Sequence, residues 1–365
     1  MTTIVLSAGG TGGHLFPAQA LAAELRARGR KIVIMTDARG RNYNTAFPGA
    51  VIETVPSGSP SEGSRVKRIL FPLEVLRGIA VALGKLLRLK PSAVVGFGGY
   101  PSLPVIAAAI IGGIPTAIHE QNAVPGRVNR LIGGRVKAIA ASFPFARLAP
   151  KNSNLVLLTG NPVRPEAAAL SSAAYQKPGL SGAIRLLVFG GSQGARALSE
   201  IVPAAVSALP IALKSRLEIV QQCRPEDLET VRLDYEAAGV HAELAAFFDD
   251  LPRRMANAHL VIARSGASTV SELAAIGRPA ILIPYPFATD DHQTANADVL
   301  EKAGAAWRIQ QSELSPQKLA ALLTQVLSDP EELARRAEAA HGLGKPDAAK
   351  RLADLVDRIG RKEAA

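Results

Sequence analysis

The sequence predicts an α/β protein made of two Rossmann-like domains that face each other across a cleft. Apolar segments rich in Val, Ile and Leu alternate with helical segments, which is typical of parallel sheets covered on both faces. The order of strand, glycine loop and helix at residues 4–21 occurs again from Ile184. With 365 residues, the chain is also long enough for two domains.

The predicted strands are short, continuous apolar runs. They cover residues 3–8, 31–37, 93–98, 116–120, 184–190, 217–222, 259–265 and 280–285. Residues 16–29 predict the first helix, with Pro17 in its first turn and Gly29 at its end. The uncharged run from Ala93 to Ile118 is as long as a membrane span, but glycines and prolines interrupt it, so it predicts strand, loop, helix and strand.

The boundary between the two domains is predicted near residues 159–165, a Gly- and Pro-containing linker. We therefore expect domains at residues 1–160 and 161–344. The tail from Pro316 has helical character, and we expect a last helix at about residues 345–365 to pack back onto the first domain.

Composition and charge indicate the cellular compartment of the protein and the kind of partner that it binds. The single cysteine, Cys223, excludes an intrachain disulfide and fits the cytosol, and the first residues lack the features of a signal peptide. Residues 1–160 hold 19 Lys and Arg against 6 Asp and Glu, whereas residues 161–365 hold 23 against 25. No nucleic-acid motif accompanies the positive half, so we expect an anionic membrane surface or an acidic ligand rather than nucleic acid.

The first glycine loop resembles a dinucleotide fingerprint only in part. Gly10 and Gly12 match two glycines of that pattern, but Leu15 stands where the third is needed. Asp37 could still bind a ribose, so a nicotinamide-dependent oxidoreductase stays open as an alternative. No GxxxxGK[ST] motif occurs anywhere in the chain.

Three polar loops follow strands of the second domain, at residues 190–195, 264–272 and 290–297. Because the carboxyl ends of parallel strands share one edge, these loops predict a ligand site. The first either binds an anion at a helix N-terminus, with the Ser192 hydroxyl as a further donor, or is only a tight turn between strand and helix. Glu272 is either half of a capping box with Thr269 or a carboxylate for a ribose diol. Asp290 either caps the next helix or binds a metal ion together with Asp291. The sequence places no third metal ligand beside these two carboxylates.

Seven motifs together resemble the MurG family of bacterial N-acetylglucosaminyltransferases, in order from about residue 5 to residue 305. They are GGTGGH, GFGGYPS, HEQN, TGNPVR, GGSQGA, RSGASTVSE and DDHQTANA. The resemblance implies the two-domain GT-B fold and inverting transfer from UDP-N-acetylglucosamine to the muramyl 4-hydroxyl of undecaprenyl-linked lipid I, forming lipid II. It implies no cofactor and no metal. A related nucleotide-sugar isomerase and a non-catalytic membrane scaffold remain alternatives.

The resemblance also assigns the donor-binding residues. Ser192 and Arg164 would face the diphosphate, Glu272 the ribose diol, Phe248 the uracil and Gln293 the sugar hydroxyls. From the first domain, Thr11, Gly12, Gly13 and Asn122 would close over donor and acceptor. The phosphate end would be lined by Ala267, Ser268, Thr269, Val270 and Ser271.

Inverting transfer needs a base near the acceptor hydroxyl, and a neutral histidine has a suitable reference pKa of about 6.5. His14 is the predicted base and His119 the second candidate; for each, the alternative is a residue that only orders its loop. Some relatives carry glutamine where this chain has His292, so we leave His292 out of the catalytic set.

Residues 65–90 combine seven basic side chains with apolar ones, which predicts a membrane-binding surface. An ordinary helix that buries its apolar stripe is the alternative. The resemblance places the protein at the cytoplasmic face of the inner membrane, with other cell-wall enzymes as further partners. The predicted surface comprises Lys67, Arg68, Ile69, Phe71, Leu76 and Ile79.

Overall fold

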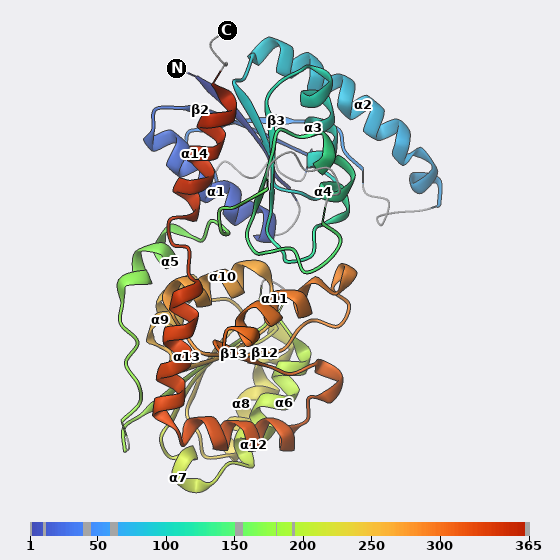
Figure 1. Cartoon of the computed structure of the whole chain (residues 1–365). Helices are drawn as coiled ribbons and strands as arrows, with labels where there is room; N and C mark the ends of the chain where they lie inside the picture. Colours follow the sequence, from blue (N-terminus) through green and yellow to red (C-terminus); the bar gives the residue numbers. More distant parts are fainter. Residues whose placement is uncertain are drawn as a thin grey trace. The chain divides into compact units, whose positions relative to one another are not determined.

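The computed structural model describes residues 2–9, 12–38, 45–58, 65–149, 156–179, 181–191 and 194–361, without the side chains of residues 65–70. The chain divides into two compact units (Figure 1). The first comprises Met1–Arg164 and Asp347–Ala365, and the second Pro165–Pro346.

The described part of the first unit contains a parallel sheet of seven strands in the order β3-β2-β1-β4-β5-β6-β7. Its strands are β1 (Thr3–Ser7), β2 (Lys31–Thr36), β3 (Val51–Thr54), β4 (Ala93–Gly96), β5 (Thr116–Glu120), β6 (Ala138–Ala141) and β7 (Val156–Leu158). Its helices are α1 (Gly12–Ala27), α2 (Arg65–Leu89), α3 (Ser102–Ile111), α4 (Arg127–Ile132) and α14 (Ala348–Gly360).

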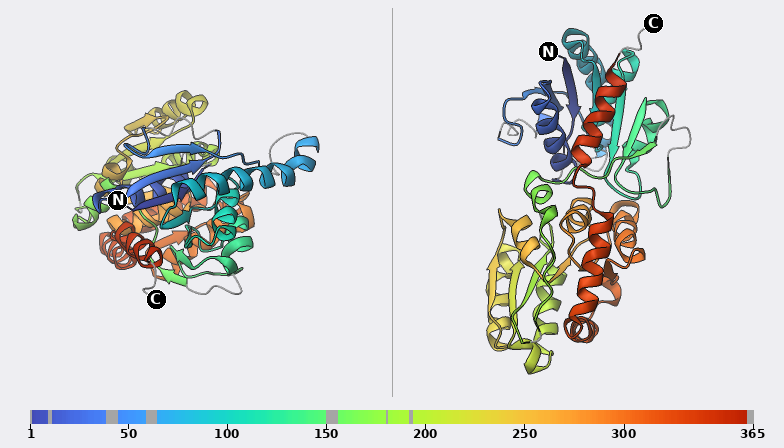
Figure 2. Two further views of the ribbon diagram at one scale, coloured as in Figure 1. Left: turned by 90° about the horizontal axis from the view of Figure 1, so that it is seen from above. Right: turned by 60° about the vertical axis from the view of Figure 1, so that its left-hand side comes forward.

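Helices cover both faces of this sheet, because its central strands are apolar on both sides. On one face, Ile4 and Leu6 of β1 pack in a cluster with Leu21 of α1 and Leu352 of α14. On the other face, Val5 packs in a cluster that includes side chains of α2, α3 and α4. The last helix, α14, therefore lies beside α1 on the first unit (Figures 1 and 2).

The second unit repeats the arrangement with a parallel sheet of six described strands in the order β10-β9-β8-β11-β12-β13. Its strands are β8 (Ile184–Phe189), β9 (Leu217–Gln222), β10 (Ala242–Ala245), β11 (Leu260–Ala263), β12 (Ala280–Leu282) and β13 (Ala306–Arg308). Its helices are α5 (Pro165–Ala169), α6 (Arg196–Ser207), α7 (Ile211–Lys214), α8 (Leu228–Ala237), α9 (Leu251–Asn257), α10 (Ala267–Ile276), α11 (His292–Lys302), α12 (Pro316–Leu327) and α13 (Pro330–Leu343).

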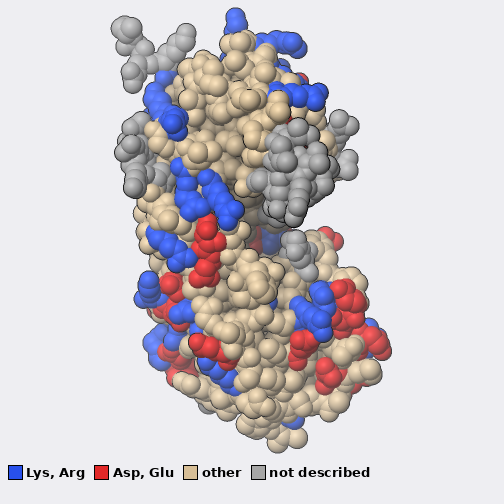
Figure 3. All heavy atoms as spheres, turned by 90° about the vertical axis from the view of Figure 1, so that its right-hand side faces the viewer, with Lys and Arg blue, Asp and Glu red and all other residues tan. Residues whose placement is uncertain are grey.

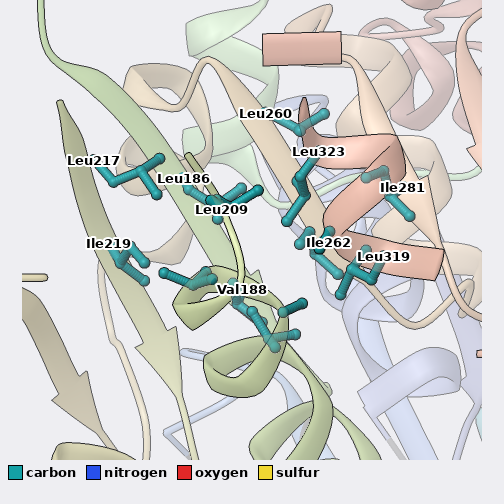
Figure 4. Close-up of a cluster of buried hydrophobic side chains, with 14 of the residues drawn as sticks. Leu186, Val188, Leu209, Leu217, Ile219, Leu260, Ile262, Ile281, Leu319 and Leu323 are labelled. Carbon is teal, nitrogen blue, oxygen red and sulfur yellow. The ribbon is translucent and has the colours of Figure 1, made fainter. Parts of the chain in front are cut away.

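One large apolar cluster stabilises the second sheet against its helices. Leu186 and Val188 of β8 and Ile262 of β11 lie in it with Leu319 and Leu323 of α12 (Figure 4). These side chains are at most 1% exposed, and burying one such side chain contributes roughly 1.5–3 kcal/mol. The loops at the strand ends therefore leave from a rigid sheet.

The structure confirms every strand predicted from an apolar run and the reading of residues 93–118 as β4, α3 and β5. The predicted start of the first helix was wrong. The helix α1 begins at Gly12 and holds Pro17 in its interior, so the second half of the glycine loop is its first turn. No helix within the described ranges combines the length and the apolar character needed to cross a bilayer.

Candidate active site

Each sheet has one point where the strand order reverses. In the first unit β1 lies between β2 and β4, and in the second β8 lies between β9 and β11. Ligands of open parallel sheets bind outside the carboxyl ends of the strands at such points, because the neighbouring loops diverge there. The two glycine loops, after β1 and after β8, both stand at these points.

His14 lies in the first turn of α1, beside the loop that follows β4. Gly98 and Gly99 of that loop have φ of +85° and +73°, a conformation that glycine adopts without steric cost. A Cβ on Gly98 would lie 3.3 Å from Cε1 of the His14 ring, so only a glycine backbone approaches the ring this closely without displacing it. Nδ1 of His14 lies 3.1 Å from Oε1 of Gln121. Gly12 and Gly13 precede His14 in the same turn, and Thr11 lies outside the described residues.

His119 is fully buried at the end of β5. Burial lowers the pKa of its imidazole to about 4, so the ring is neutral near pH 7. Its Nε2 lies 3.3 Å from the carbonyl oxygen of Gly160, and its Nδ1 lies 3.1 Å from Nε2 of Gln121. These contacts make His119 an internal support rather than a residue open to an acceptor.

Glu120 shapes the loop that carries Asn122. Its carboxylate accepts hydrogen bonds from the backbone N–H of Asn122 at 3.0 Å and of Gly126 at 2.9 Å. The side-chain amide of Asn129 in α4 donates to it at 2.8 Å. The loop after β5 is therefore held from several sides, and the Asn122 side chain lies at its start.

The segment TGNPVR lies at the end of the first unit. The Arg164 guanidinium stands 5.5 Å from the centroid of the Phe16 ring in α1, a cation–π contact. Asn161 is 3% exposed, and neither polar atom of its side chain has a hydrogen-bond partner among the described residues. An unpaired buried amide is costly, so Asn161 marks a polar position that the motif alone did not single out.

In the second unit, the loop after β8 has no space for a side chain at position 190. A Cβ on Gly190 would lie 2.4 Å from the backbone nitrogen of Ala195. Gly191 and Gly194 have φ of +85° and +70°. The loop leads into α6, whose N-terminus can bind an anion. Ser192 lies outside the described residues.

The helix α10 begins at Ala267 with Gly266 as its N-cap, so the capping-box alternative for Thr269 and Glu272 is excluded. Thr269 already lies inside the helix, where its hydroxyl cannot cap it. Glu272 is 3% exposed. The buried hydroxyls of Ser268 and Ser271 have no hydrogen-bond partner among the described residues, as expected of groups that bind a ligand. Val270 is buried in the same helix.

Gln293 lies in α11 and is connected to the start of α10. Its backbone oxygen accepts from the Ser265 hydroxyl at 2.8 Å, and its Oε1 accepts from the Tyr285 N–H at 2.9 Å. Asn296 of α11 donates to the Ser265 carbonyl at 3.2 Å. The structure therefore brings the predicted α10 and Gln293 positions together.

Phe248 follows β10 and is buried, with the Arg254 guanidinium 4.2 Å from its ring centroid. Arg264, which the sequence analysis did not single out, donates to the carbonyl oxygens of Ile283 and Pro284 at 3.1 Å. Burial lowers the pKa of this guanidinium. The hydrogen bonds of Arg264 thus connect the loop after β11 with the loop after β12.

Asp290 is not the N-cap of α11, since Asp291 takes that position. Both residues adopt left-handed conformations, with φ of +52° and +49°. Among the described residues, no group of three or more His, Cys, Asp or Glu side chains could hold a metal ion. The Asp291 carboxylate accepts from the Thr294 hydroxyl at 2.6 Å.

The predicted membrane segment forms α2. Phe71 is half-buried and makes an edge contact with Tyr100 at 5.7 Å, and Ile79 packs against the core. Leu76 is 64% exposed, as is Leu73, which the prediction did not include. The side chains of Lys67, Arg68 and Ile69 lie outside the described residues.

Two family models match the chain, one for each unit. The N-terminal domain of glycosyltransferase family 28 matches residues 4–141, and the C-terminal domain of that family matches residues 185–352. The two units are therefore the N- and C-terminal domains of a glycosyltransferase.

Relatives are similar over nearly the whole chain. A UDP-N-acetylglucosamine–N-acetylmuramyl-(pentapeptide) pyrophosphoryl-undecaprenol N-acetylglucosamine transferase of Paramagnetospirillum magneticum is 51% identical, over 97% of this chain and 95% of the relative. The transferase of the same name from Chelativorans sp. is 50% identical over 99% and 96%. The crystal structure of Acinetobacter baumannii MurG superposes with a TM-score of 0.81 at 30% identity, covering 98% of this chain and all of that one. The chain belongs to the MurG family of these transferases.

Proposed function

We propose that this chain transfers N-acetylglucosamine from UDP-N-acetylglucosamine to the muramyl 4-hydroxyl of undecaprenyl-linked lipid I, with inversion at the sugar carbon, releasing UDP and forming lipid II. The observation that carries the proposal is 51% identity, across 97% of the chain, to a transferase named for this donor and acceptor. The site geometry agrees with the chemistry.

The donor binds to the second unit. The loop of Gly190, Gly191 and Gly194 leads into the N-terminus of α6, which accommodates the diphosphate because the first N–H groups of a helix have no partner within the helix. The Ser268 and Ser271 hydroxyls, which have no partner within the described ranges, donate to oxygens of UDP-N-acetylglucosamine. The phosphate end also includes Ser192, Ala267, Thr269 and Val270.

Three further groups recognise the rest of the donor. The buried Glu272 carboxylate accepts two hydrogen bonds from the ribose diol. Phe248 packs near the uracil, and Gln293 binds sugar hydroxyls with its amide. Hydrogen bonds to an ionised group contribute about 1.5–3 kcal/mol each, so Glu272 gives selectivity for a ribonucleotide.

Catalysis needs stabilisation of the departing UDP and removal of the acceptor proton. Negative charge develops on the diphosphate, and preorganised N–H groups at the loop after β8, together with Arg164, stabilise that charge. His14 takes the proton of the 4-hydroxyl as general base. Thr11, Gly12, Gly13 and Asn122 form the first unit's contribution to the reacting sugars.

The first unit binds the lipid-linked acceptor and the cytoplasmic face of the inner membrane. On the face displayed in Figure 3, Lys and Arg dominate the first unit, whereas both charges mix over the second. On α2, Leu73 and Leu76 are 64% exposed and Arg77 is exposed beside them. Exposed leucines among basic residues suit an anionic lipid interface.

The test is turnover of UDP-N-acetylglucosamine with and without authentic lipid I. We expect UDP release only with lipid I, and a product that carries one added N-acetylhexosamine. Consumption of the donor without an acceptor would instead identify a nucleotide-sugar isomerase. No turnover with lipid I would refute the proposal.

A further inference from the structure

Gln121 connects the two histidines of the first unit. Its Oε1 lies 3.1 Å from Nδ1 of His14, and its Nε2 lies 3.1 Å from Nδ1 of His119. Gln121 is 2% exposed and stands just after β5. Gln121 is the third residue of the HEQN motif, and no role in binding or catalysis is predicted for it from that motif.

A hydrogen bond to the backbone fixes the positions of the amide nitrogen and the amide oxygen of Gln121. Nε2 of Gln121 lies 2.9 Å from the carbonyl oxygen of Phe97, an atom that only accepts. The opposite orientation would place two acceptor oxygens at that distance. Nε2 therefore faces Phe97 and His119, and Oε1 faces His14.

This orientation determines the protonation of both rings. Because Oε1 only accepts, Nδ1 of His14 carries the hydrogen of their bond, and in the neutral ring the lone pair is on Nε2. Because Nε2 of Gln121 donates, Nδ1 of His119 accepts. Nε2–H of His119 then donates to the Gly160 carbonyl.

The hydrogen bonds therefore run in one direction, from His14 through Gln121 and His119 to the backbone. A second proton on His119 would oppose the Gln121 amide, which agrees with the lowered pKa of this buried ring. A Cβ on Gly98 would lie 3.3 Å from the His14 ring and one on Gly99 3.6 Å from it, so the loop after β4 leaves little space beside the ring.

We propose that Gln121 is a positioning residue that holds His14 in its Nδ1–H tautomer and so directs Nε2 to the acceptor hydroxyl. This role rests on the proposed function. Nε2 takes the proton of the 4-hydroxyl as its oxygen bonds to the sugar carbon. The bond from that carbon to UDP breaks, and UDP leaves with the electron pair. The His14 imidazolium keeps its hydrogen bond to Gln121 and later releases the proton to water.

The direct test is the tautomer of His14, read from multiple-bond ¹H–¹⁵N spectra of full-length protein labelled at histidine nitrogen, at a pH where the ring is neutral. The signals of His14 are those missing in His14→Asn. We expect the Nδ1–H pattern for His14 and the Nε2–H pattern for His119. An Nε2–H pattern for His14 in the wild-type protein overturns the inference, and this readout needs neither a variant of Gln121 nor any turnover.

A variant tests the link to catalysis. Gln121→Met keeps the side-chain length and removes the amide, so His14 should lose its preference for Nδ1–H. We expect kcat with lipid I to fall about 10- to 100-fold, less than the 10²–10⁴ of a lost base, with KM for UDP-N-acetylglucosamine unchanged. A kcat equal to that of the wild type, or an unchanged His14 tautomer, overturns the positioning role.

Gln19→Met is the matched control. The Gln19 amide also donates to a backbone carbonyl, that of Ala46 at 2.9 Å, and Gln19 lies on α1 with His14. We expect this variant to keep both the tautomer and kcat. If wild-type protein fails to use lipid I but shows the expected tautomers, the proposed function fails while the structural assignment holds.

Discussion

Acidification should destabilise the first unit through His119. The folded state lowers the pKa of this buried ring to about 4, whereas the unfolded chain has a pKa of about 6.5. Between these values the unfolded state binds one more proton, so the free energy of unfolding falls as pH falls from 6.5 towards 4. The difference of about 2.5 pKa units corresponds to about 3 kcal/mol, at up to about 1.4 kcal/mol per pH unit. Above pH 6.5 this contribution is fully present.

The assay is native-state hydrogen exchange in the intact chain, followed at core amides of β1 and β4 such as Val5 and Val95. His119→Asn removes the titration, so its free energy of unfolding should depend less steeply on pH than that of the wild type, whatever its stability at pH 7. His259 in the second unit, whose pKa burial also lowers to about 4, provides the control. His259→Asn should leave the pH dependence of the first unit unchanged. Equal pH dependence in wild type and His119→Asn would refute the reasoning.

Four further predictions follow from single sites. Gly190→Ala places a Cβ 2.4 Å from a backbone nitrogen, so calorimetry should show donor binding at least about tenfold weaker, while circular dichroism shows an intact fold. Glu272→Gln should raise KM for UDP-N-acetylglucosamine about 10- to 100-fold, as expected for losing about 1.5–3 kcal/mol of charged hydrogen bonding; an unchanged KM would exclude the ribose contact. His14→Ala should lower kcat about 10²- to 10⁴-fold while the affinity for UDP-N-acetylglucosamine stays constant. Equal losses in kcat and in donor affinity would indicate a structural role for His14. Leu73→Ser with Leu76→Ser should weaken sedimentation with anionic vesicles while a soluble acceptor analogue is still used.

The sequence predicted the strands that are long and apolar, because a buried parallel strand leaves a continuous signal. It did not predict β3, β6, β7, β10 or β13, each of which is only three or four residues long. The start of α1 was misplaced because Pro17, typical of a first turn, lies within the helix. Thr269 and Glu272 matched a capping box by spacing, but the helix start at Gly266 depends on how β11 ends.

The candidate site was predictable as a set of loops but not as a hydrogen-bond network. Motifs placed His14 and Glu272 in helices that follow strands, and parallel topology puts the starts of such helices at one edge of each sheet. The role of Gln121 depends on the Phe97 carbonyl after β4 and on the His14 ring of α1, two positions that only the folded sheet brings to one amide. No periodicity or spacing encodes that contact.

The two glycine loops have equivalent places in the two sheets but supply different chemistry. After β8 the glycine loop leads into the N-terminus of α6, which suits an anion, whereas after β1 the helix α1 carries the His14 imidazole in its first turn. The groups that orient that imidazole come from the loop after β4 and from residues at the end of β5. All of them belong to the first unit, so the tautomer of His14 does not depend on where the second unit stands. In the proposed reaction, a histidine oriented in this way within one unit can take the acceptor proton as soon as acceptor and donor are both bound.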